Sequence, residues 1–372
     1  MKIDRNECPL CDGVFSEKFK TNLPVFMGVN ISEVTEKTSE CTICECNDCG
    51  EVFIKELLDM NDVYLNNHNI QVVGKMWEEH YDELSKFIAE DIQNKKVFEV
   101  GDPSAKIVRK LSNFDSWVIV EPNPYDDVVH IKNVELIEQF FDESFVYNKC
   151  VDVIIHSHFF EHLYNPNTFL KKCNEMLNHD GIIIMSIPDM DFFLESGFSP
   201  FNILHFEHTY FINKPVLEFL ANKNGFIILD EKRYNNHSVF YKLKKSNDVS
   251  NKQLDLKIGL KFCEIWEKSI SNIKRINNLI DKYDSKNLYL FGAHVTSQFY
   301  LHNGLNKTDI IGIIDNSKSK QGYTLYGTDY KVFSSEILEN LNECVLICSH
   351  TGIYEEEIKH NLLKINKNIK FI

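Results

Sequence analysis

KVFEVGDPSA, at residues 96–105, is the stretch that decides the fold. An apolar run ends at Gly101 and the amphipathic stretch 106–111 follows, a pattern that predicts a strand, a tight turn and a helix. A second apolar run, SWVIVEP at 116–122, ends in the acid Glu121. In a Rossmann-like sheet the glycine turn passes beneath a cofactor, and an acid ending the next strand accepts hydrogen bonds from its ribose. The alternative for Glu121 is a solvated strand-end carboxylate. The expected cofactor site contains Gly101, Asp102, Glu121 and Pro122.

The same turn indicates which kind of cofactor fits. A dinucleotide needs several amide groups facing its phosphates across a glycine-rich turn and an open helix N-terminus. Here Gly101 is the only glycine of the turn, and Pro103 has no amide proton. A cofactor without phosphates fits better, and we expect S-adenosylmethionine (SAM).

Short apolar runs alternate with amphipathic segments along most of the chain. Runs at 151–157, 181–188 and 226–231 predict further strands, with helical spacing between them. Such alternation predicts a mainly parallel sheet with helices on both faces. After a strand-free amphipathic segment at about 251–284, the pattern restarts. The predicted fold class is α/β, with a small N-terminal metal module at 1–60, a central Rossmann-like sheet at 61–250, and a helical connector with a smaller Rossmann-like domain at 251–372.

Length and charge limit the possible classes of protein. The 372 residues exceed one ordinary core, and a hydrophobic content of 43% argues against disorder. The net charge of −15 disfavours nucleic acids and anionic membranes as partners. No apolar run approaches the roughly 20 residues of a membrane span, and the start lacks the apolar core of a signal peptide. We therefore expect a cytoplasmic protein, and monomer and homodimer both remain open.

Six of the eleven cysteines lie within the first 49 residues. In a reducing compartment such crowding favours a metal over disulfides. CPLC at 8–11 and CNDC at 46–49 are two knuckles that together offer the tetrahedral thiolate set of a structural Zn²⁺. A third knuckle lies at 41–44, but the glycine after Cys49 favours the later pair. Buried thiols without a metal are the alternative. The expected ligands are Cys8, Cys11, Cys46 and Cys49.

A dense group of titratable side chains lies at 205–210, HFEHTY. Histidine titrates near neutrality, so imidazoles beside a carboxylate offer a base and a group that orients it. This density favours a functional site over packing.

Two further stretches make the sequence resemble a known group of enzymes. VDVIIHSHFFEHLYNP at 151–166 and MLNHDGIIIMSIPD at 176–189 resemble the latter half of class I SAM-dependent methyltransferases. The whole layout resembles a narrower family, the C-methyltransferases that act on nucleotide-linked keto-deoxysugars, over almost the full chain. That family has a four-cysteine zinc module, a SAM-binding core and a C-terminal Rossmann-like domain. The most specific matches are the cysteine knuckles, Glu121-Pro122, Phe160-Glu161-His162, residues 205–211, Asn236-His237-Ser238, Phe291-Gly292-Ala293, residues 314–322 and Tyr326-Gly327-Thr328.

The resemblance implies methyl transfer from SAM to a carbon of a nucleotide-linked keto sugar, within surface-polysaccharide or related sugar biosynthesis. Carbon methylation needs a base that removes a proton next to the ketone, and groups that stabilise the enolate. The resemblance implies His208 as the base, with Glu207, His162 and His205 around the sugar and the enolate. His158 joins the cofactor site. The expected substrate contacts are Tyr64, Tyr210, His237, Gly292 and His294, and for His294 helix capping is the alternative.

The chain departs from the family pattern at several positions. The family prefers small, Asn/Asp and Gly residues after the first glycine, whereas this chain has DPSA at 102–105, so SAM is held in an altered pose or the site has lost it. The family often has Tyr at position 205, and residues 65–68 match its Tyr- and Ser-rich segment poorly. Two rival functions stay open: a sugar O- or N-methyltransferase, and a catalytically degenerate SAM-fold protein that serves as a sugar-nucleotide binding or scaffold module.

Overall fold

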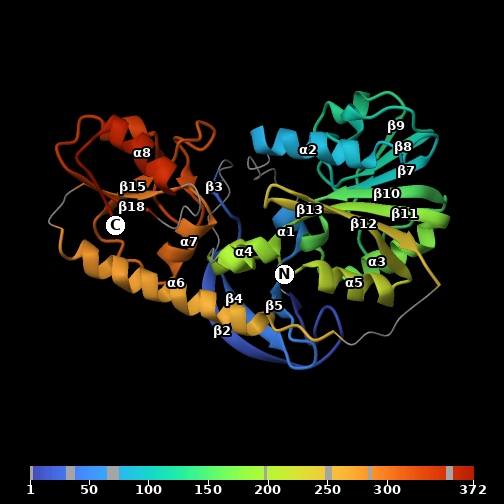
Figure 1. Cartoon of the computed structure of the whole chain (residues 1–372), viewed down its shortest axis with the longest axis horizontal. Coiled ribbons are helices and arrows are strands. Elements are labelled where there is room, and N and C mark those ends of the chain that lie inside the picture. The colour runs from blue at the N-terminus through green and yellow to red at the C-terminus, as the bar shows by residue number, and fades with distance from the viewer. Residues whose placement is uncertain are drawn as a thin grey trace.

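The computed structural model describes residues 3–30, 38–64, 75–196, 199–247, 254–283, 287–348 and 355–372. Figure 1 shows two α/β units side by side, with the N-terminal strands, in blue, beneath and between them. The long helix α6 (Ile258–Ile280) runs from the N-terminal strands to the second unit and forms most of the predicted connector. The poorly matching segment 65–68 lies outside the described residues.

The larger unit is built on a seven-stranded sheet in the order β12-β13-β11-β10-β7-β8-β9. Neighbouring strands are parallel from β11 to β9, whereas β13 is antiparallel to both β11 and β12. Successive side chains alternate between two apolar cores, so Val97 packs on one face and Phe98 on the other. The strands are β7 (Lys96–Val100), β8 (Ser116–Val120), β9 (Val134–Ile137), β10 (Val151–Ser157), β11 (Leu177–Pro188), β12 (Phe226–Tyr234) and β13 (Ser238–Lys245).

Helices cover both faces of this sheet, as the sequence predicts. α2 (Lys75–Ile88) packs on one face, and α3 (Pro166–Met176) and α5 (Lys214–Lys223) pack on the other. Asn165 and Asn213 cap the last two, because each side chain accepts a hydrogen bond from the amide three residues on. The shorter helices are α1 (Met60–Tyr64), α4 (Met190–Ser196) and the 3₁₀ turns η2 (Val128–His130), η3 (Phe160–His162) and η4 (Pro200–Asn202).

The prediction of a helix over 106–111 is wrong. Only a short 3₁₀ turn, η1 (Val108–Lys110), forms there. Ala105, the residue just before this stretch, has a φ of +53° in the left-handed region, so an α-helix cannot extend back through it. The Asp102 carboxylate accepts hydrogen bonds from the amides of Ser104 and Ile107 at 3.1 and 3.3 Å, which gives these groups partners outside a helix. The turn after Gly101 therefore leads into an irregular loop.

The N-terminal strands join the two units. A three-stranded antiparallel sheet, β2-β4-β5, lies beneath them, and backbone hydrogen bonds connect β5 to residues 209–211 of the larger unit. On the other side β3 pairs with β16 of the second unit. The strands are β1 (Ile3–Asp4), β2 (Phe15–Pro24), β3 (Val29–Asn30), β4 (Thr38–Cys46), β5 (Val52–Ile54), β6 (Glu56–Leu57) and β16 (Thr324–Leu325).

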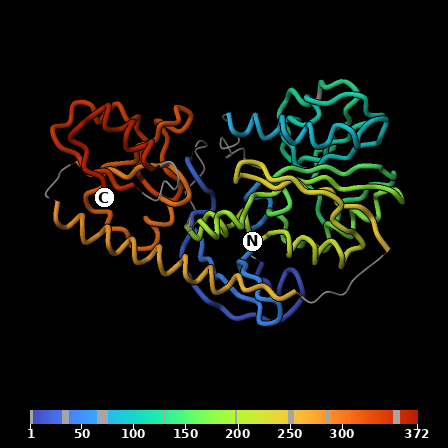
Figure 2. Tube along the Cα trace, in the orientation of Figure 1, coloured from blue at the N-terminus to red at the C-terminus, as the bar shows by residue number. Residues whose placement is uncertain are grey.

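The second unit is a smaller α/β domain on a five-stranded parallel sheet, in the order β17-β15-β14-β18-β19. Figure 2 follows the chain from the blue N-terminal strands through the larger unit to this orange and red domain. Among the described residues, none of the helices has the length and apolarity needed to span a membrane. The elements are β14 (Leu288–Phe291), α7 (Val295–His302), β15 (Ile310–Ile314), β17 (Val332–Phe333), η5 (Ser335–Leu338), β18 (Cys344–Cys348), α8 (Glu355–Ile365) and β19 (Ile369–Phe371).

Candidate active site

A cavity of about 1090 Å³ opens beside the carboxyl ends of β7, β8 and β10. Open α/β sheets bind their ligands at this edge. The wall combines all three parts of the chain, with Arg5 from the N-terminal strands, Glu121 from the larger unit and Val295 from the second unit. A ligand in this cavity would therefore contact the whole assembly.

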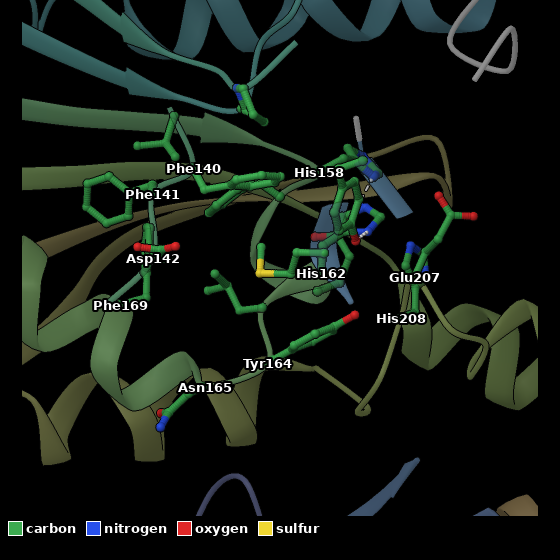
Figure 3. Close-up of a pocket in the computed structure, with 18 of the residues that line it drawn as sticks. Phe140, Phe141, Asp142, His158, His162, Tyr164, Asn165, Phe169, Glu207 and His208 are labelled. Carbon is green, nitrogen blue, oxygen red and sulfur yellow. Dashed lines mark hydrogen bonds and ion pairs between the residues drawn. The ribbon is translucent and has the colours of Figure 1, made fainter. Parts of the chain in front are cut away.

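The two ends of the cavity differ in chemistry, as Figure 3 shows. Phe141 and Asp142 lie at one end, Glu207 and His208 lie at the other, and His162 lies between them. The turn end comprises Gly101–Ser104, Glu121–Asn123 and Phe140–Asp142. The imidazole end comprises Glu161, His162, His205, Glu207 and His208.

Gly101 needs to be glycine for two reasons. Its φ of +78° lies in the left-handed region, and a Cβ atom there would stand 2.6 Å from Cδ2 of Phe159. The Phe159 ring therefore packs directly against the turn. Asp102, which the sequence assigns to the cofactor, is buried, and its carboxylate binds amides of its own loop. Asp102 thus shapes the turn.

Glu121 is a buried acid in the cavity wall, only 8% exposed, so the solvated interpretation of this residue is wrong. Its Oε1 accepts a hydrogen bond from the Asn123 amide at 3.0 Å. Burial, offset in part by that hydrogen bond, raises the pKa of the Glu121 carboxyl to about 7. Pro122 follows it in the wall. A carboxylate at this position can accept hydrogen bonds from a ligand's hydroxyl groups.

Sequence reasoning missed several residues at the turn end. Trp77 and Tyr81 reach the cavity from α2, and Phe140, Phe141 and Asp142 reach it from the loop after β9. Strand β9 is short and only half-buried, so it gave no clear apolar run. The signal that was available is the pair of phenylalanines followed by an acid, which comes directly after the third strand of the unit.

Three imidazoles meet at the imidazole end. The ring centres of His205 and His208 lie 4.2 Å apart, and those of His162 and His208 lie 4.8 Å apart. A tight backbone loop causes the first contact, because the amides and carbonyls of His205 and His208 bond to each other at 3.1 and 2.9 Å. The Tyr64 hydroxyl lies 3.1 Å from Nδ1 of His162. The structure therefore brings Tyr64 and all three predicted histidines together.

Burial sets the protonation of the His205 and His208 rings. Desolvation lowers the pKa of His208 well below its usual range, and lowers that of His205 to about 4. Both rings are therefore neutral near pH 7, and a neutral imidazole can accept a proton. Nδ1 of His208 has no hydrogen-bond partner within the part of the chain that the structure describes.

Glu161 is a fully buried acid that sequence reasoning left without a role. One of its oxygens lies 3.2 Å from Nδ1 of His158, at ion-pair distance. Ligand atoms of Glu161, His162 and His208 also lie within 4.8 Å of one another. Burial raises the pKa of the Glu161 carboxyl to about 7. His158 has a φ of +48°, a strained conformation that is typical of functional sites.

The loop that carries His205 and His208 is held by the N-terminal strands. The buried Arg5 guanidinium donates to the Ile54 carbonyl at 2.8 Å and to the Thr209 carbonyl at 3.1 Å. Tyr210, a predicted substrate contact, is fully buried, and its hydroxyl donates to the Phe160 carbonyl at 2.6 Å. Tyr210 therefore connects the loop to η3 and acts as a positioning residue, because it lies behind the cavity wall.

Two predicted substrate contacts of the second unit lie away from the cavity wall. Nδ1 of His294 accepts the Thr296 amide at 3.2 Å and caps α7, so the capping alternative is correct. Gly292 has a φ of +97°, and a Cβ there would stand 2.2 Å from the His294 ring. The amide of Ala293 is already bound by the Asp315 carboxylate at 2.8 Å, which leaves this turn poorly suited to a phosphate. His237 also lies away from the wall, in a separate histidine cluster.

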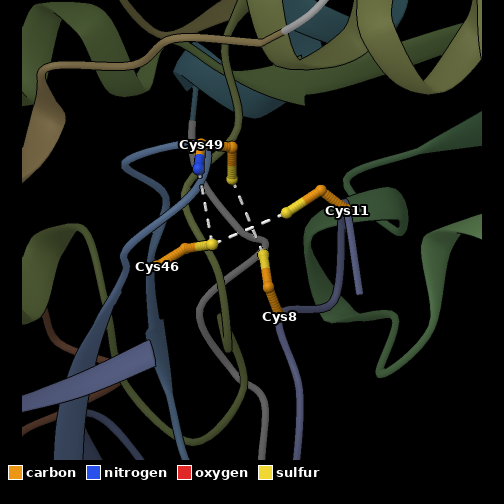
Figure 4. A group of neighbouring side chains, drawn as sticks. All are labelled: Cys8, Cys11, Cys46 and Cys49. Carbon is orange, nitrogen blue, oxygen red and sulfur yellow. Dashed lines mark hydrogen bonds between the residues drawn. The ribbon is translucent and has the colours of Figure 1, made fainter. Parts of the chain in front are cut away.

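Four cysteines converge where the N-terminal strands meet (Figure 4). The sulfurs of Cys8 and Cys49 lie 3.7 Å apart, and those of Cys11 and Cys46 lie 3.5 Å apart. All four lie within 4.8 Å of one another. Sulfurs placed about 2.3 Å from a tetrahedral ion are about 3.8 Å apart, so the donor set fits Zn²⁺. The rival knuckle of Cys41 and Cys44 is buried within β4, outside this group.

Comparison with solved structures finds methyltransferases. The chain is similar to the 1,6-didemethyltoxoflavin N1-methyltransferase of Burkholderia thailandensis, at 14% identity and a TM-score of 0.38 over 46% of this chain and 80% of that one. It is similar to the N-methyltransferase NodS of Bradyrhizobium japonicum with bound S-adenosylhomocysteine, at 10% identity and a TM-score of 0.38 over 48% and 93%. A third is a putative SAM-dependent methyltransferase of Listeria monocytogenes, at 12% identity and a TM-score of 0.35 over 46% and 100%.

The larger unit has a mixed sheet with helices on both faces. No family model matches the chain, and no curated protein is similar to it in sequence. The function therefore has to be argued from the site.

Proposed function

We propose that this chain is a SAM-dependent methyltransferase that methylates a carbon of a nucleotide-linked keto sugar. The observation that carries the proposal is one continuous cavity that joins the turn end to the imidazole end. A cofactor held at the first end and a base at the second can then act on one substrate. The sequence resemblance supports a sugar as that substrate and polysaccharide biosynthesis as its setting.

The turn end fits the cofactor. Glu121 ends a central strand as a buried carboxylate, and its ionised form accepts the hydrogen bonds of two ribose hydroxyls. Phe140 and Phe141 offer apolar surface for a flat base. Gly101 lets the backbone come close, and Pro122 and His158 complete the wall. Bound SAM would supply an electrophilic methyl group.

The imidazole end supplies the proton chemistry. His208, neutral and in the cavity wall, removes the proton next to the ketone. The electron pair moves onto the ketone oxygen, and N–H groups of His162 and His205 stabilise the enolate that forms. Glu207 holds a sugar hydroxyl, and Tyr64 orients His162 through the 3.1 Å contact between its hydroxyl and Nδ1. An O- or N-methyltransferase would not need a base that removes a carbon-bound proton next to a ketone.

Zinc has a structural role in this proposal. Four thiolates leave no open position on a tetrahedral ion, so the ion does not take part in the chemistry. Gly50 follows the last ligand, and β5 begins two residues later at Val52. Because β5 pairs with residues 209–211, the zinc knuckle fixes the loop that carries His208.

A second candidate function is a sugar-nucleotide binding or scaffold protein that has lost SAM. The observation that favours it is the Phe159 ring packed against Gly101, where the cofactor turn should be open. Methyl transfer requires that Phe159 leave room for SAM in the neighbouring part of the cavity.

Calorimetry with SAM and S-adenosylhomocysteine separates the two functions. Methyl transfer predicts one equivalent bound per chain, with weaker binding after Glu121→Gln. The matched control, Glu138→Gln, changes an acid outside the wall and should bind as the wild type does. No heat from either ligand at millimolar concentration would favour the scaffold and contradict our proposal.

A further inference from the structure

Three histidines gather at the carboxyl end of β10, apart from the four cysteines. His80 comes from α2, His158 follows β10, and His237 lies in the turn between β12 and β13. Their ligand nitrogens lie within 4.8 Å of one another. Residues 80, 158 and 237 are far apart in sequence, so only the fold brings these rings together.

The ring nitrogens of this three-histidine cluster point at one spot. The Ser238 hydroxyl lies 3.2 Å from Nδ1 of His80, 2.8 Å from Nε2 of His158 and 2.6 Å from Nδ1 of His237. Three imidazole lone pairs that converge on one point form the ligand set of many transition-metal sites. A hydroxyl at that point is a further oxygen donor.

The outer ring nitrogens of His80 and His158 also lie close to polar groups. Nε2 of His80 lies 3.1 Å from the Ser157 hydroxyl, and Nδ1 of His158 lies 3.2 Å from the Glu161 carboxylate. Metal-binding histidines commonly direct their second nitrogen at a carboxylate or hydroxyl group, which fixes the tautomer. A ring that donates its outer N–H to such a partner has an unprotonated inner nitrogen that is able to bind a metal.

The cluster is partly buried, because His80 is buried and His158 and His237 are half-buried. Trp77 packs edge-to-face on His80, His158 and His237, with ring-centre distances of 5.3, 4.8 and 4.6 Å. The His80 side chain is fully buried. Burial lowers the pKa of His80 to about 2 and those of the other two rings to about 3. Neutral imidazole is the form that binds metals.

We propose that His80, His158 and His237 bind a divalent transition-metal ion of the zinc class, with Ser238 or water as the fourth ligand. Zinc lies about 2.0–2.1 Å from imidazole nitrogens, so the rings close in slightly and the Ser238 hydroxyl turns aside or coordinates. The rival interpretation is a hydrogen-bonded cluster, in which one hydroxyl donates to one ring and accepts from two.

An ion at this place would act on the neighbouring active site through one residue. His158 lines the cavity, and its outer nitrogen faces Glu161, which in turn lies against His162 and His208. The ion would fix the orientation of the His158 ring and therefore the position of the Glu161 carboxylate. This makes His80 and His237 positioning residues for the imidazole end.

Metal counting tests the site without any assay of methyl transfer. The full chain is equilibrated with buffered Zn²⁺ and its zinc content is measured per chain. We expect His80→Asn and His237→Asn each to hold one equivalent less than the wild type. The matched control His179→Asn, which changes a histidine that is 90% exposed, should lose none. Equal zinc content in the wild type and both cluster variants would overturn the proposal.

A measurement on the wild type keeps the test valid if a variant fails to fold. Anomalous scattering from a crystal of the wild type soaked in Zn²⁺ should show a peak between the three inner nitrogens. Absence of that peak, when a peak does appear among the four cysteines, would leave the hydrogen-bonded cluster as the correct interpretation. Neither result depends on SAM, so a failure here is distinguishable from a failure of the proposed methyl transfer.

Discussion

In the proposed function Glu121 holds the ribose of SAM, and the ionisation of its carboxyl should control that contact. Burial raises the pKa of its carboxyl to about 7, and only the ionised form accepts both ribose hydroxyls. SAM affinity should therefore rise with pH. Between pH 6 and pH 8 the ionised fraction grows from about one tenth to about nine tenths, which corresponds to an about ninefold gain.

Calorimetric titrations of SAM at pH 6, 7 and 8 measure this effect. Glu121→Gln has no carboxyl to ionise, so its profile reports any titration of the ligand itself and serves as the control. A wild-type profile that follows that of Glu121→Gln would show that the carboxylate does not hold the ribose.

Some residues of the candidate site could be predicted from the sequence, and others could not. Glu121 could be predicted because it ends an apolar strand, and the histidines at 205 and 208 stood out by their density. His80 could not, because on α2 it looks like any polar residue of an amphipathic helix. Its contacts to Ser157 and Ser238 cross 77 and 158 positions of sequence, and no local pattern encodes them. Asp102 stays a predicted cofactor contact that lines the cavity, and the sequence did not show that its carboxylate also binds amides of its own loop.

At the scale of elements, the cysteine knuckle at 46–49 and the loop that carries His205 and His208 form one structural unit. Cys46 ends β4, the turn closes with Gly50, and β5 then pairs with residues 209–211. No residue with a side chain fits at position 50, because a Cβ on Gly50 would stand 1.7 Å from the Leu256 carbonyl oxygen. Loss of the ion should therefore disturb the loop as well as the knuckle.

Cys46→Ala should lower the zinc content by one equivalent and the melting temperature by several degrees, because it removes one of four ligands. Zinc analysis and thermal unfolding measure both. Cys44→Ala, a buried thiol outside the group, controls for the loss of a core sulfur. Unchanged zinc after Cys46→Ala, with loss after Cys44→Ala, would assign the site to the Cys41/Cys44 knuckle.

Strands could be predicted where the sequence has a clear apolar run. Strands β7, β8, β10, β11 and β12 follow apolar runs and form as expected. The helix predicted over 106–111 does not form although its apolar spacing is helical, and the chain just before it is irregular, with a left-handed Ala105 and a Ser104 amide bound to Asp102. Backbone conformation of a non-glycine residue leaves no mark in hydrophobic periodicity.

At the scale of the whole molecule, the N-terminal strands tie the two α/β units together. The fully buried Gln298 side chain accepts the Gly28 amide at 2.9 Å and donates to the carbonyls of Phe26 and Tyr326 at 3.1 Å each. This connection was not predictable, because the first 60 residues read as a separate module. The resemblance did imply three parts, but not that the first one joins the others.

Gln298→Ala removes three hydrogen bonds between a buried side chain and backbone groups, so we expect a loss of about 2–4 kcal/mol in the free energy of unfolding. Denaturant unfolding measures it, and Gln139→Ala, on the exposed surface, should cost less than about 0.5 kcal/mol. A wild-type unfolding curve for Gln298→Ala would mean that this contact does not hold the units together.

The position of the transferred methyl group tests the central claim most directly. The protein is incubated with SAM labelled with ¹³C at the methyl group and a panel of nucleotide-linked keto sugars, and the product is analysed by NMR. We predict a new carbon–carbon bond next to the ketone, formed by the wild type and slowed at least about a hundredfold in His208→Asn. A methyl group on oxygen or nitrogen, or a His208→Asn variant as fast as the wild type, would contradict the account.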